Sequence, residues 1–239
     1  MVNLSVILPA YREKESLEVL LPRIKSVLED MGLAFQILVV DTQIPMDTTG
    51  ELCRQINVDY INREDKNTYG AAIRTGIKHS QGNKIIIMDA DGSHKPEDIK
   101  ELYKWSRDFD LVIGSRYIKY GKTENNFILI LMSLMVNIAY RFFLNIKVKD
   151  VSNSFRLYDT KKLSSLVLEC ENFDLVEEIL IKLTLEYPNL KIKEIPIVFK
   201  KRTHGESKRD LIKFIFSYLT TMHRLIRIKN SYKKFRGME

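Results

Sequence analysis

Short apolar runs alternate with amphipathic stretches along the first half of the chain. The apolar runs predict buried β-strands at residues 4–8, 35–40, 58–62, 84–88 and 110–113. Apolar side chains recur at helical spacing between the first two runs, and helices are also predicted at residues 70–80 and 96–107. Strands that alternate with helices in this way are typical of a parallel, doubly wound α/β sheet.

The second half has a different pattern, dominated by one long apolar segment. Residues 127–139 are almost wholly apolar, but as a helix they would cover about 20 Å, short of a hydrocarbon core of about 30 Å. We therefore expect a buried or interfacial helix here and not a spanning one. Ser133 and Asn137 begin a polar stripe on it, which continues through Tyr140 and Arg141. A helix after Phe173 and one strand at residues 192–199 are expected to follow.

The basic charge of the chain is concentrated at its carboxyl end. Of the 239 residues, with a net charge of +7, the last 40 contain twelve lysines and arginines against three acidic residues, whereas the rest is nearly neutral. Residues 207–229 predict a two-faced helix with Arg209, Lys213, Arg224 and Arg227 on one side. Such a helix can dock on the core or lie on an anionic bilayer. No nucleic-acid recognition motif accompanies it, so nucleic acid is the less favoured partner.

Composition limits the class of protein. With 45% hydrophobic and 29% charged residues, the chain is neither disordered nor a disulfide scaffold. Cys53 and Cys170 do not form a Cys-x-x-Cys pair, and the residues after Met1 do not resemble a secretory signal. These features predict a cytoplasmic protein.

Polar residues follow several of the predicted strands, and in a parallel sheet those positions share one edge, where ligands bind. Asp41 follows the second strand, Asp89 and Asp91 follow the fourth, and Arg116 lies just beyond the fifth. Three carboxylates and a guanidinium are therefore expected to converge there.

Asp89 and Asp91 are the candidate metal ligands. Carboxylate oxygens suit Mg²⁺ or Mn²⁺, which proteins commonly hold with one or two carboxylates and the phosphates of a substrate. The alternative is a solvated turn that caps the helix after Pro96. The chain contains neither a Walker loop nor a G-x-G-x-x-G sequence, and no His/Cys cluster has zinc spacing.

Several motifs occur together in the order that one enzyme family shows. They are residues 6–13 (VILPAYRE), 39–41 (VVD), 70–72 (GAA), 89–94 (DADGSH), 114–117 (GSRY), 150–158 (DVSNSFRLY), 194–197 (EIPI) and 202–208 (RTHGESK). Together these residues resemble the family 2 glycosyltransferases of the GT-A fold. The second half is similar to their polyprenol-phosphate (dolichol-phosphate) mannosyl- and glucosyltransferase branch.

The resemblance implies an inverting transfer of a hexose from a nucleotide-sugar donor of the GDP-mannose or UDP-glucose type to a polyprenyl monophosphate. It implies that the donor is bound by Pro9, Tyr11, Glu13, Asp41, Asp89 and Asp91. Asp89 and Asp91 would hold the Mg²⁺ or Mn²⁺ on the diphosphate. The site would lie at the cytoplasmic face of a membrane, and a separate integral-membrane partner subunit would be compatible with a chain that docks only peripherally.

A phosphate acceptor is already anionic, so it needs cations to position it and no general base. The candidate acceptor-phosphate residues are Arg116, Ser133, Asn137, Arg156, Arg202 and Lys208. Asp91 and Arg116 are the candidate catalytic residues. We expect one GT-A domain over residues 1–229, with a nucleotide-sugar half (1–117) and an acceptor half (118–229), followed by a basic tail (230–239).

Three positions depart from the family pattern. Thr42 replaces a second aspartate, Ser154 replaces a glycine, and the arginine usual shortly before Ser133 is missing. Two alternatives therefore stay open: a family 2 enzyme that acts on a saccharide or another hydroxyl acceptor, and a non-catalytic relative that scaffolds a membrane glycosylation complex.

Overall fold

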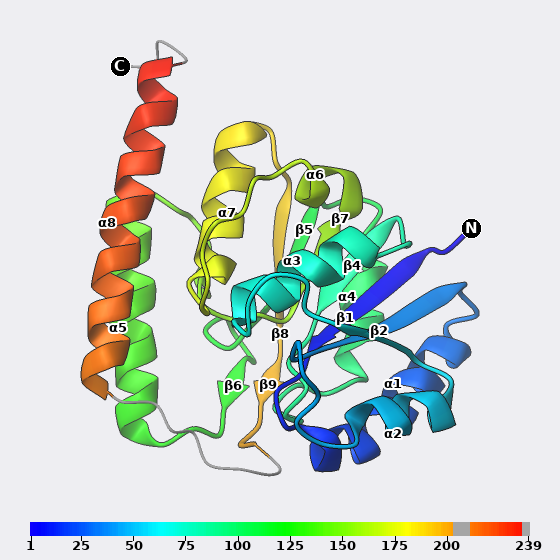
Figure 1. The fold of residues 1–239 in the computed structure, drawn as a ribbon. Coiled ribbons are helices and arrows are strands. Elements are labelled where there is room, and N and C mark those ends of the chain that lie inside the picture. The colour runs from blue at the N-terminus through cyan, green and yellow to red at the C-terminus, as the bar shows by residue number, and fades with distance from the viewer. Residues whose placement is uncertain (203–210, 236–239) are drawn as a thin grey trace.

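One mixed sheet of seven strands forms the centre of the protein (Figure 1). The computed structural model describes residues 1–202 and 211–235, with side chains in the second range for residues 218–232. The strands are β1 Leu4–Pro9, β2 Phe35–Asp41, β3 Asp59–Asn62, β4 Lys84–Ile87, β5 Leu111–Ser115, β6 Lys122–Thr123, β7 Arg156–Asp159, β8 Ile192–Pro196 and β9 Val198–Phe199. The helices are α1 Lys14–Asp30, α2 Thr49–Ile56, α3 Tyr69–His79, α4 Asp98–Lys104, α5 Phe127–Leu144, α6 Thr160–Ser164, α7 Leu175–Glu186 and α8 Leu211–Phe235.

The large sheet has the order β3-β2-β1-β4-β7-β5-β8, and β6 pairs with β9 in a small separate sheet. All strands of the large sheet run parallel except β7, which is inserted antiparallel between β4 and β5. The doubly wound, mostly parallel α/β fold expected from the sequence is confirmed. The insertion of β7 was not predicted, and the expected strand at 192–199 is divided into β8 and β9.

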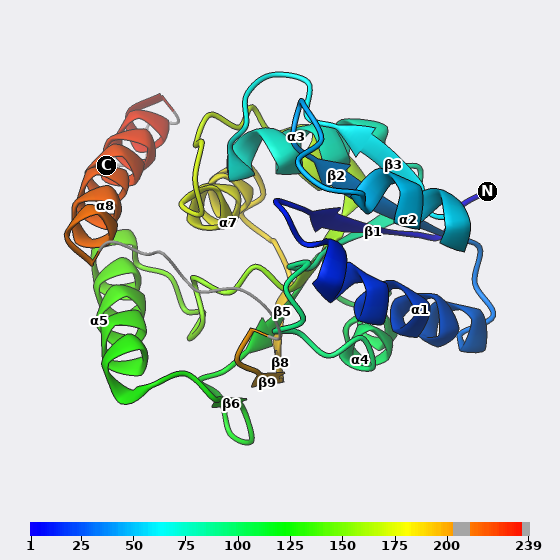
Figure 2. The same ribbon diagram turned by 60° about the horizontal axis from the view of Figure 1, so that its bottom comes forward.

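Apolar cores on both faces of the sheet explain why its central strands are continuous apolar runs. Along β1, Val6 and Leu8 face the core under α1, α2 and α4, while Ile7 faces the opposite core under α3 and α7. The same alternation continues in β2 and β4. Figure 2 shows α1 and α4 on one side of the sheet and α3 and α7 on the other. Burial from both sides fixes the register, so the carboxyl ends of β1 and β4 are level.

Helices α5 and α8 lie side by side at one flank of the molecule (Figures 1 and 2). Helix α5 begins at the Asn126 cap, whose side chain accepts a hydrogen bond from the Leu129 amide, and ends at Asn145 in the left-handed conformation. The rings of Tyr140 on α5 and Tyr218 on α8 meet at 6.1 Å. Leu225 of α8 is fully buried, so this helix is partly a core element.

The expected apolar helix is longer than the sequence indicated. It extends over 18 residues, or about 27 Å, and by length and composition alone it could cross a membrane. The expected length of about 20 Å was therefore too short, because it counted only the apolar residues 127–139, whereas the helix continues through the polar stripe to Leu144. The expected boundary at residue 229 lies inside α8, which continues to Phe235.

Candidate functional site

A cleft of about 850 Å³ opens at the carboxyl ends of β1, β4 and β5 and runs toward α5 and α7. Eight of the predicted site residues line it: Pro9, Tyr11, Glu13, Asp89, Asp91, Arg116, Ser133 and Arg202. They come from segments far apart in sequence, which the parallel register brings to one edge. The expected convergence of Asp89, Asp91 and Arg116 is therefore present, whereas Lys208 lies outside the described residues.

An acidic cluster occupies the end of the cleft nearest β1 and β4. Asp91 is buried, and its Oδ1 accepts a hydrogen bond from the Ser93 amide at 3.0 Å. Its Oδ2 accepts one from Nε of Arg202 at 2.7 Å. Burial raises the pKa of Asp91, but the hydrogen bonds from Ser93 and the charge of Arg202 bring that pKa below its usual value. Burial raises the pKa of the nearby Glu13 above its usual value, although Arg202 opposes the shift.

His94 holds the turn that carries these aspartates. The Asp89 amide donates to its Nδ1 at 3.3 Å, and its Nε2 meets Oδ1 of Asn153 at 3.1 Å. The imidazole stacks on Phe155 with ring centroids 4.8 Å apart. Asn153 in turn donates to the carbonyl of Gly114 at the end of β5. This chain of contacts links the Asp-x-Asp turn to the segment that carries Arg116.

Arg116 is held by a buried ion pair with Asp150. Its Nε and Nη2 donate to the two carboxylate oxygens at 2.8 and 2.7 Å, and its amide donates to the same group at 2.9 Å. The Asp150 side chain is 0% exposed and that of Arg116 is 8% exposed. Burial lowers the pKa of Arg116, but the adjacent Asp150 outweighs this effect and raises it overall. The guanidinium is thus a fixed, permanent cation at the wall of the cleft.

Three predicted site residues are not among those that line the cleft. The Asp41 carboxylate accepts hydrogen bonds from the Tyr60 hydroxyl at 3.0 Å and the Thr42 amide at 2.7 Å. Burial and the hydrogen bond to Asp41 raise the pKa of the Tyr60 hydroxyl to about 12. Asn137 accepts from the Val151 amide at 2.7 Å and donates to the Ser133 carbonyl at 2.8 Å.

Arg156 is the third of these residues, and it is fully buried in β7. Its two Nη atoms donate to the carbonyls of Val176 and Val151 at 3.1 and 2.6 Å. The side chains of Asp41, Asn137 and Arg156 therefore form hydrogen bonds with other protein groups behind the cleft. They support its walls and are not among the residues that line it.

Arg63 lines the cleft, and the sequence analysis missed it. It is 6% exposed and donates to the carbonyls of Ala10 and Thr68, while Nε has no hydrogen-bond partner among the described residues. Burial lowers its pKa, although Asp41 opposes the shift. The sequence could have indicated Arg63, because it directly follows β3, and residues at the carboxyl ends of parallel strands share the edge of the sheet where ligands bind.

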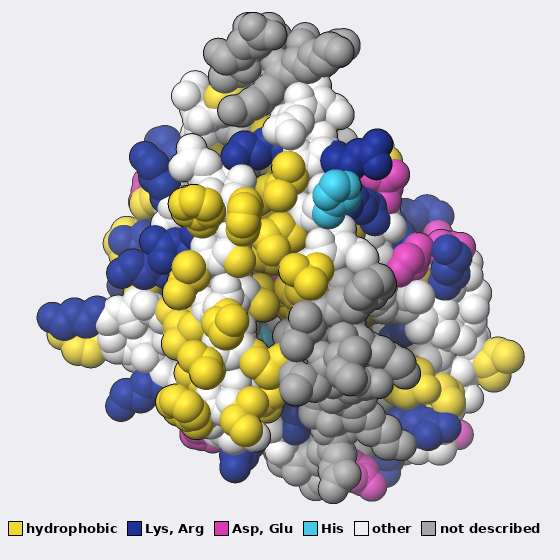
Figure 3. Space-filling view, turned by 90° about the vertical axis from the view of Figure 1, so that its left-hand side faces the viewer, with side chains coloured by type: hydrophobic (Ala, Val, Ile, Leu, Met, Phe, Trp, Pro, Cys, Tyr) yellow, Lys and Arg dark blue, Asp and Glu magenta, His cyan; other side chains and the backbone are white. Residues whose placement is uncertain are grey.

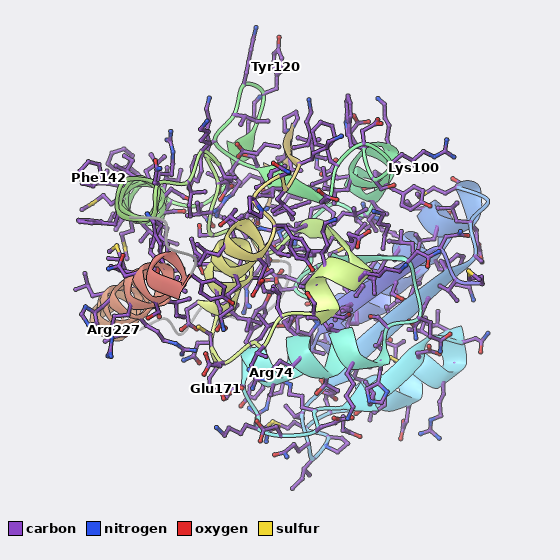
Figure 4. All side chains as sticks on the ribbon, turned by 90° about the horizontal axis from the view of Figure 1, so that it is seen from above. Arg74, Lys100, Tyr120, Phe142, Glu171 and Arg227 are labelled. Carbon is purple, nitrogen blue, oxygen red and sulfur yellow. The ribbon has the colours of Figure 1, made fainter. Side chains whose placement is uncertain are left out.

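Another wall of the cleft is formed by the start of α3 and the residues that precede α7. The rings of Tyr69 and Phe173 stack at 4.5 Å, and the carboxylate of Glu171 accepts hydrogen bonds from Thr68 at 2.6 Å and Arg74 at 3.2 Å. The Thr68 hydroxyl, followed by nearby cations, lowers the pKa of Glu171 to about 2. Figure 4 shows Arg74 and Glu171 next to each other. No local sequence pattern could predict this contact, because Thr68 and Glu171 are 103 residues apart in the sequence.

The other end of the cleft is largely apolar. Leu129, Met132 and Val136 of α5 line it together with Val176 of α7 and Tyr218 of α8. Ser133 lies on the same wall. The cleft thus joins a charged end at the sheet to an apolar end between the flanking helices.

The cleft fits a divalent cation only if a ligand supplies part of the coordination shell. Within the described ranges, no three His, Cys, Asp or Glu side chains are placed to hold a metal ion together. Asp89 and Asp91 offer hard oxygen atoms at the cleft surface, the type of donor that Mg²⁺ and Mn²⁺ take alongside substrate phosphates.

A doubly wound sheet with an Asp-x-Asp turn at a strand end is the arrangement expected of the GT-A class of glycosyltransferases. The family model for glycosyl transferase family 2 matches residues 5–167. The chain belongs to this family, and the predicted resemblance to its polyprenol-phosphate branch is confirmed by the relatives that follow.

Two relatives share most of the chain. It is 35% identical over 235 residues to a dolichol-phosphate mannosyltransferase of Pyrococcus furiosus, which covers 95% of this chain and 64% of the relative. The chain therefore spans less than two thirds of that protein. It is 30% identical over 221 residues to a polyprenol monophosphomannose synthase of Mycolicibacterium smegmatis, covering 85% of this chain and 79% of the relative.

Among solved structures, glucosyl-3-phosphoglycerate synthase from Mycobacterium tuberculosis, in complex with Mn²⁺, UDP and phosphoglyceric acid, superimposes with a TM-score of 0.74. The match covers 94% of this chain and 78% of the other, at 17% identity. At that identity the likeness shows the fold alone, and it confirms the expected GT-A architecture.

Proposed function

We propose that this protein transfers a hexose from a nucleotide-sugar donor to a polyprenyl monophosphate at a membrane surface, with inversion at the anomeric carbon. One observation carries the proposal: a single cleft joins the acidic cluster and Arg116 to an apolar end along α5. The names of the relatives, a dolichol-phosphate mannosyltransferase and a polyprenol monophosphomannose synthase, support the same acceptor class and favour mannose as the sugar.

The charged end would take the donor diphosphate. Asp89 and Asp91 would hold Mg²⁺ or Mn²⁺ there, and the bound cation would neutralise charge that develops on the leaving diphosphate. Pro9, Tyr11 and Arg63 line the neighbouring wall, where the nucleoside would lie. His94 keeps the aspartate turn in place without reaching the reacting atoms.

Arg116 would position the acceptor phosphate. Because Asp150 already fixes the guanidinium in a bidentate pair, the Arg116 side chain would lose little conformational entropy when an anion binds to it. The acceptor oxygen is already negative, so it needs no proton removed before it attacks the anomeric carbon from the face opposite the diphosphate. The polyprenyl chain would leave the site through the apolar end of the cleft.

The outer face of α5 would dock on lipid. Ile128, Leu131, Met135, Ile138 and Phe142 are exposed at helical spacing, and each has between 48% and 79% of its surface accessible. Figure 3 shows them as a continuous apolar patch with lysines and arginines around it, and Figure 4 shows Phe142 directed away from the body. The patch lies beside the apolar end of the cleft. A peripheral position is favoured over a spanning one because α5 packs along α8, which bears Arg224 and Arg227.

The proposed activity is tested by offering purified protein GDP- and UDP-hexoses, Mn²⁺ and a short polyprenyl phosphate. We expect the sugar to appear on the lipid phosphate, and transfer to stop when a chelator removes the metal ion. Transfer to a saccharide in preference to the lipid phosphate would contradict the acceptor assignment.

The membrane face makes a separate prediction. The double variant Ile138→Glu/Phe142→Glu is expected to lose most binding to anionic vesicles, because it places two charges on the buried side of the contact. Co-sedimentation with vesicles measures the loss. Val19→Glu, at an apolar residue of α1 that is 56% exposed, is the matched control and should bind as the parent does. Equal binding by all three proteins would show that α5 is not the docking face.

A further inference from the structure

Arg202 contacts Asp91, one of the two carboxylates that the proposed function assigns to the metal ion. Its Nε donates to Oδ2 of Asp91 at 2.7 Å, and its Nη2 lies 3.9 Å from Oε1 of Glu13. The Asp91 side chain is 8% exposed and that of Glu13 is 14% exposed, so water screens this cluster poorly. The arginine side chain is 38% exposed at the open side of the cleft.

Charge balance explains why a cation belongs there. Asp89, Asp91 and Glu13 line the same end of the cleft, and Arg202 lies within 4 Å of carboxylate oxygens of both Asp91 and Glu13, at 2.7 and 3.9 Å. Like charges at such a site repel, and Arg202 relieves part of that repulsion when no donor is bound. A divalent cation would relieve it as well, but it would have to approach the Asp91 carboxylate against the positive charge of the guanidinium.

We infer that Arg202 is a resident counter-ion that competes with the divalent cation for Asp91 in the donor-free protein. The nucleotide diphosphate would then resolve the competition, since its oxygens offer the guanidinium an alternative partner and complete the coordination of the metal ion. Metal and diphosphate would consequently bind together with positive coupling, and the metal alone would bind weakly.

This inference rests on the proposed function, because it takes the metal site as given. It goes beyond that function by assigning to one residue the coupling between the binding of the metal ion and that of the diphosphate. The position of Arg202 makes this feasible: its side chain is exposed enough to exchange partners, unlike Arg116, which is locked against Asp150.

The test measures Mn²⁺ affinity by the loss of the free-ion EPR signal, without nucleotide and with saturating GDP or UDP. Arg202→Gln is expected to bind Mn²⁺ about ten-fold more tightly than the parent without nucleotide. With the nucleotide that binds, the advantage should disappear or reverse, because the variant has lost a partner for the diphosphate. Arg202→Lys should stay close to the parent without nucleotide.

Lys201→Gln is the matched control. Lys201 is exposed and precedes Arg202 in the sequence, so its substitution removes the same charge without changing the contact with Asp91. An equal gain in this variant would overturn the inference, since the effect would then be general electrostatics. Unchanged affinity of Arg202→Gln without nucleotide would also overturn it. Failure of the parent to bind Mn²⁺ even with either nucleotide would instead contradict the metal site of the proposed function, and the inference with it. Thermal melting of each variant verifies that the fold is retained.

Discussion

Asp91→Asn is expected to reduce sugar transfer by about a thousand-fold while leaving the fold intact. Asparagine has the shape of aspartate, and its carbonyl oxygen can still accept the hydrogen bond that the Ser93 amide donates at 3.0 Å. The variant loses the negative charge that would hold the metal ion and that pairs with Arg202 at 2.7 Å. The loss should therefore fall on the chemistry and on metal binding, not on stability.

Initial rates of transfer to polyprenyl phosphate measure this effect, with circular dichroism and thermal melting to compare the folds. Asp30→Asn is the matched control, because Asp30 is an exposed aspartate at the end of α1 that forms an ion pair with Lys100 at 3.4 Å. It should retain the parent rate. Substantial transfer by Asp91→Asn at ordinary Mn²⁺ concentrations would show that the aspartate does not hold the metal ion.

Most of the site residues that the sequence could predict follow from one rule: residues directly after parallel strands share one edge of the sheet, where ligands bind. Pro9, Asp89 and Arg116 follow apolar runs, and parallel strands with level ends bring such residues together whatever the detail of the packing. Asp41 also follows an apolar run, but it is not among the residues that line the cleft. It is at the end of β2, but Tyr60 of the neighbouring β3 donates a hydrogen bond to it, and a cross-strand cover of this kind depends on tertiary structure.

The parts that were missed depend on contacts between distant segments. Strand β7 has four residues, Arg156–Asp159, too few to show a period, and it is stabilised by pairing with β4 on one side and β5 on the other. Its antiparallel insertion carries Arg156 into the core, where an arginine is improbable from sequence alone. The polar stripe of α5 was predicted, but its partners were not: Tyr140 donates a hydrogen bond to the Tyr218 carbonyl of α8 and Asn137 accepts one from the Val151 amide, which the sequence pattern could not show.

The two ion pairs at the cleft have different physical roles, and this difference organises the site. Arg202 pairs with Asp91 through a side chain that is 38% exposed, so its contact can be exchanged for a ligand. Arg116 pairs with an Asp150 that is 0% exposed, so its contact is structural, and under the proposed function the fixed guanidinium would position the acceptor phosphate. The guanidinium of Arg202 can therefore exchange partners, whereas that of Arg116 is fixed.

Asp150→Asn is accordingly expected to lower the free energy of unfolding by about 3–5 kcal/mol, because it leaves the buried guanidinium of Arg116 without a counter-charge. Urea denaturation measures the change. Asp159→Asn is the matched control: its partner Lys84 is 3.0 Å away, but the two side chains are 25% and 20% exposed. Loss of this more solvated pair should cost under about 1 kcal/mol. A cost as small for Asp150→Asn would contradict the structural role of the buried pair.

The double variant Arg116→Gln/Asp150→Asn separates the stability of this pair from its function. The two neutral side chains no longer leave a charge buried, and the asparagine can still accept from the amide of residue 116, which donates at 2.9 Å in the parent. We expect the double variant to regain at least half of the stability lost by Asp150→Asn, yet to transfer sugar no better than Arg116→Gln alone. If transfer returned together with stability, the cation would be needed only to hold the fold, and the acceptor phosphate would have to be positioned by other groups.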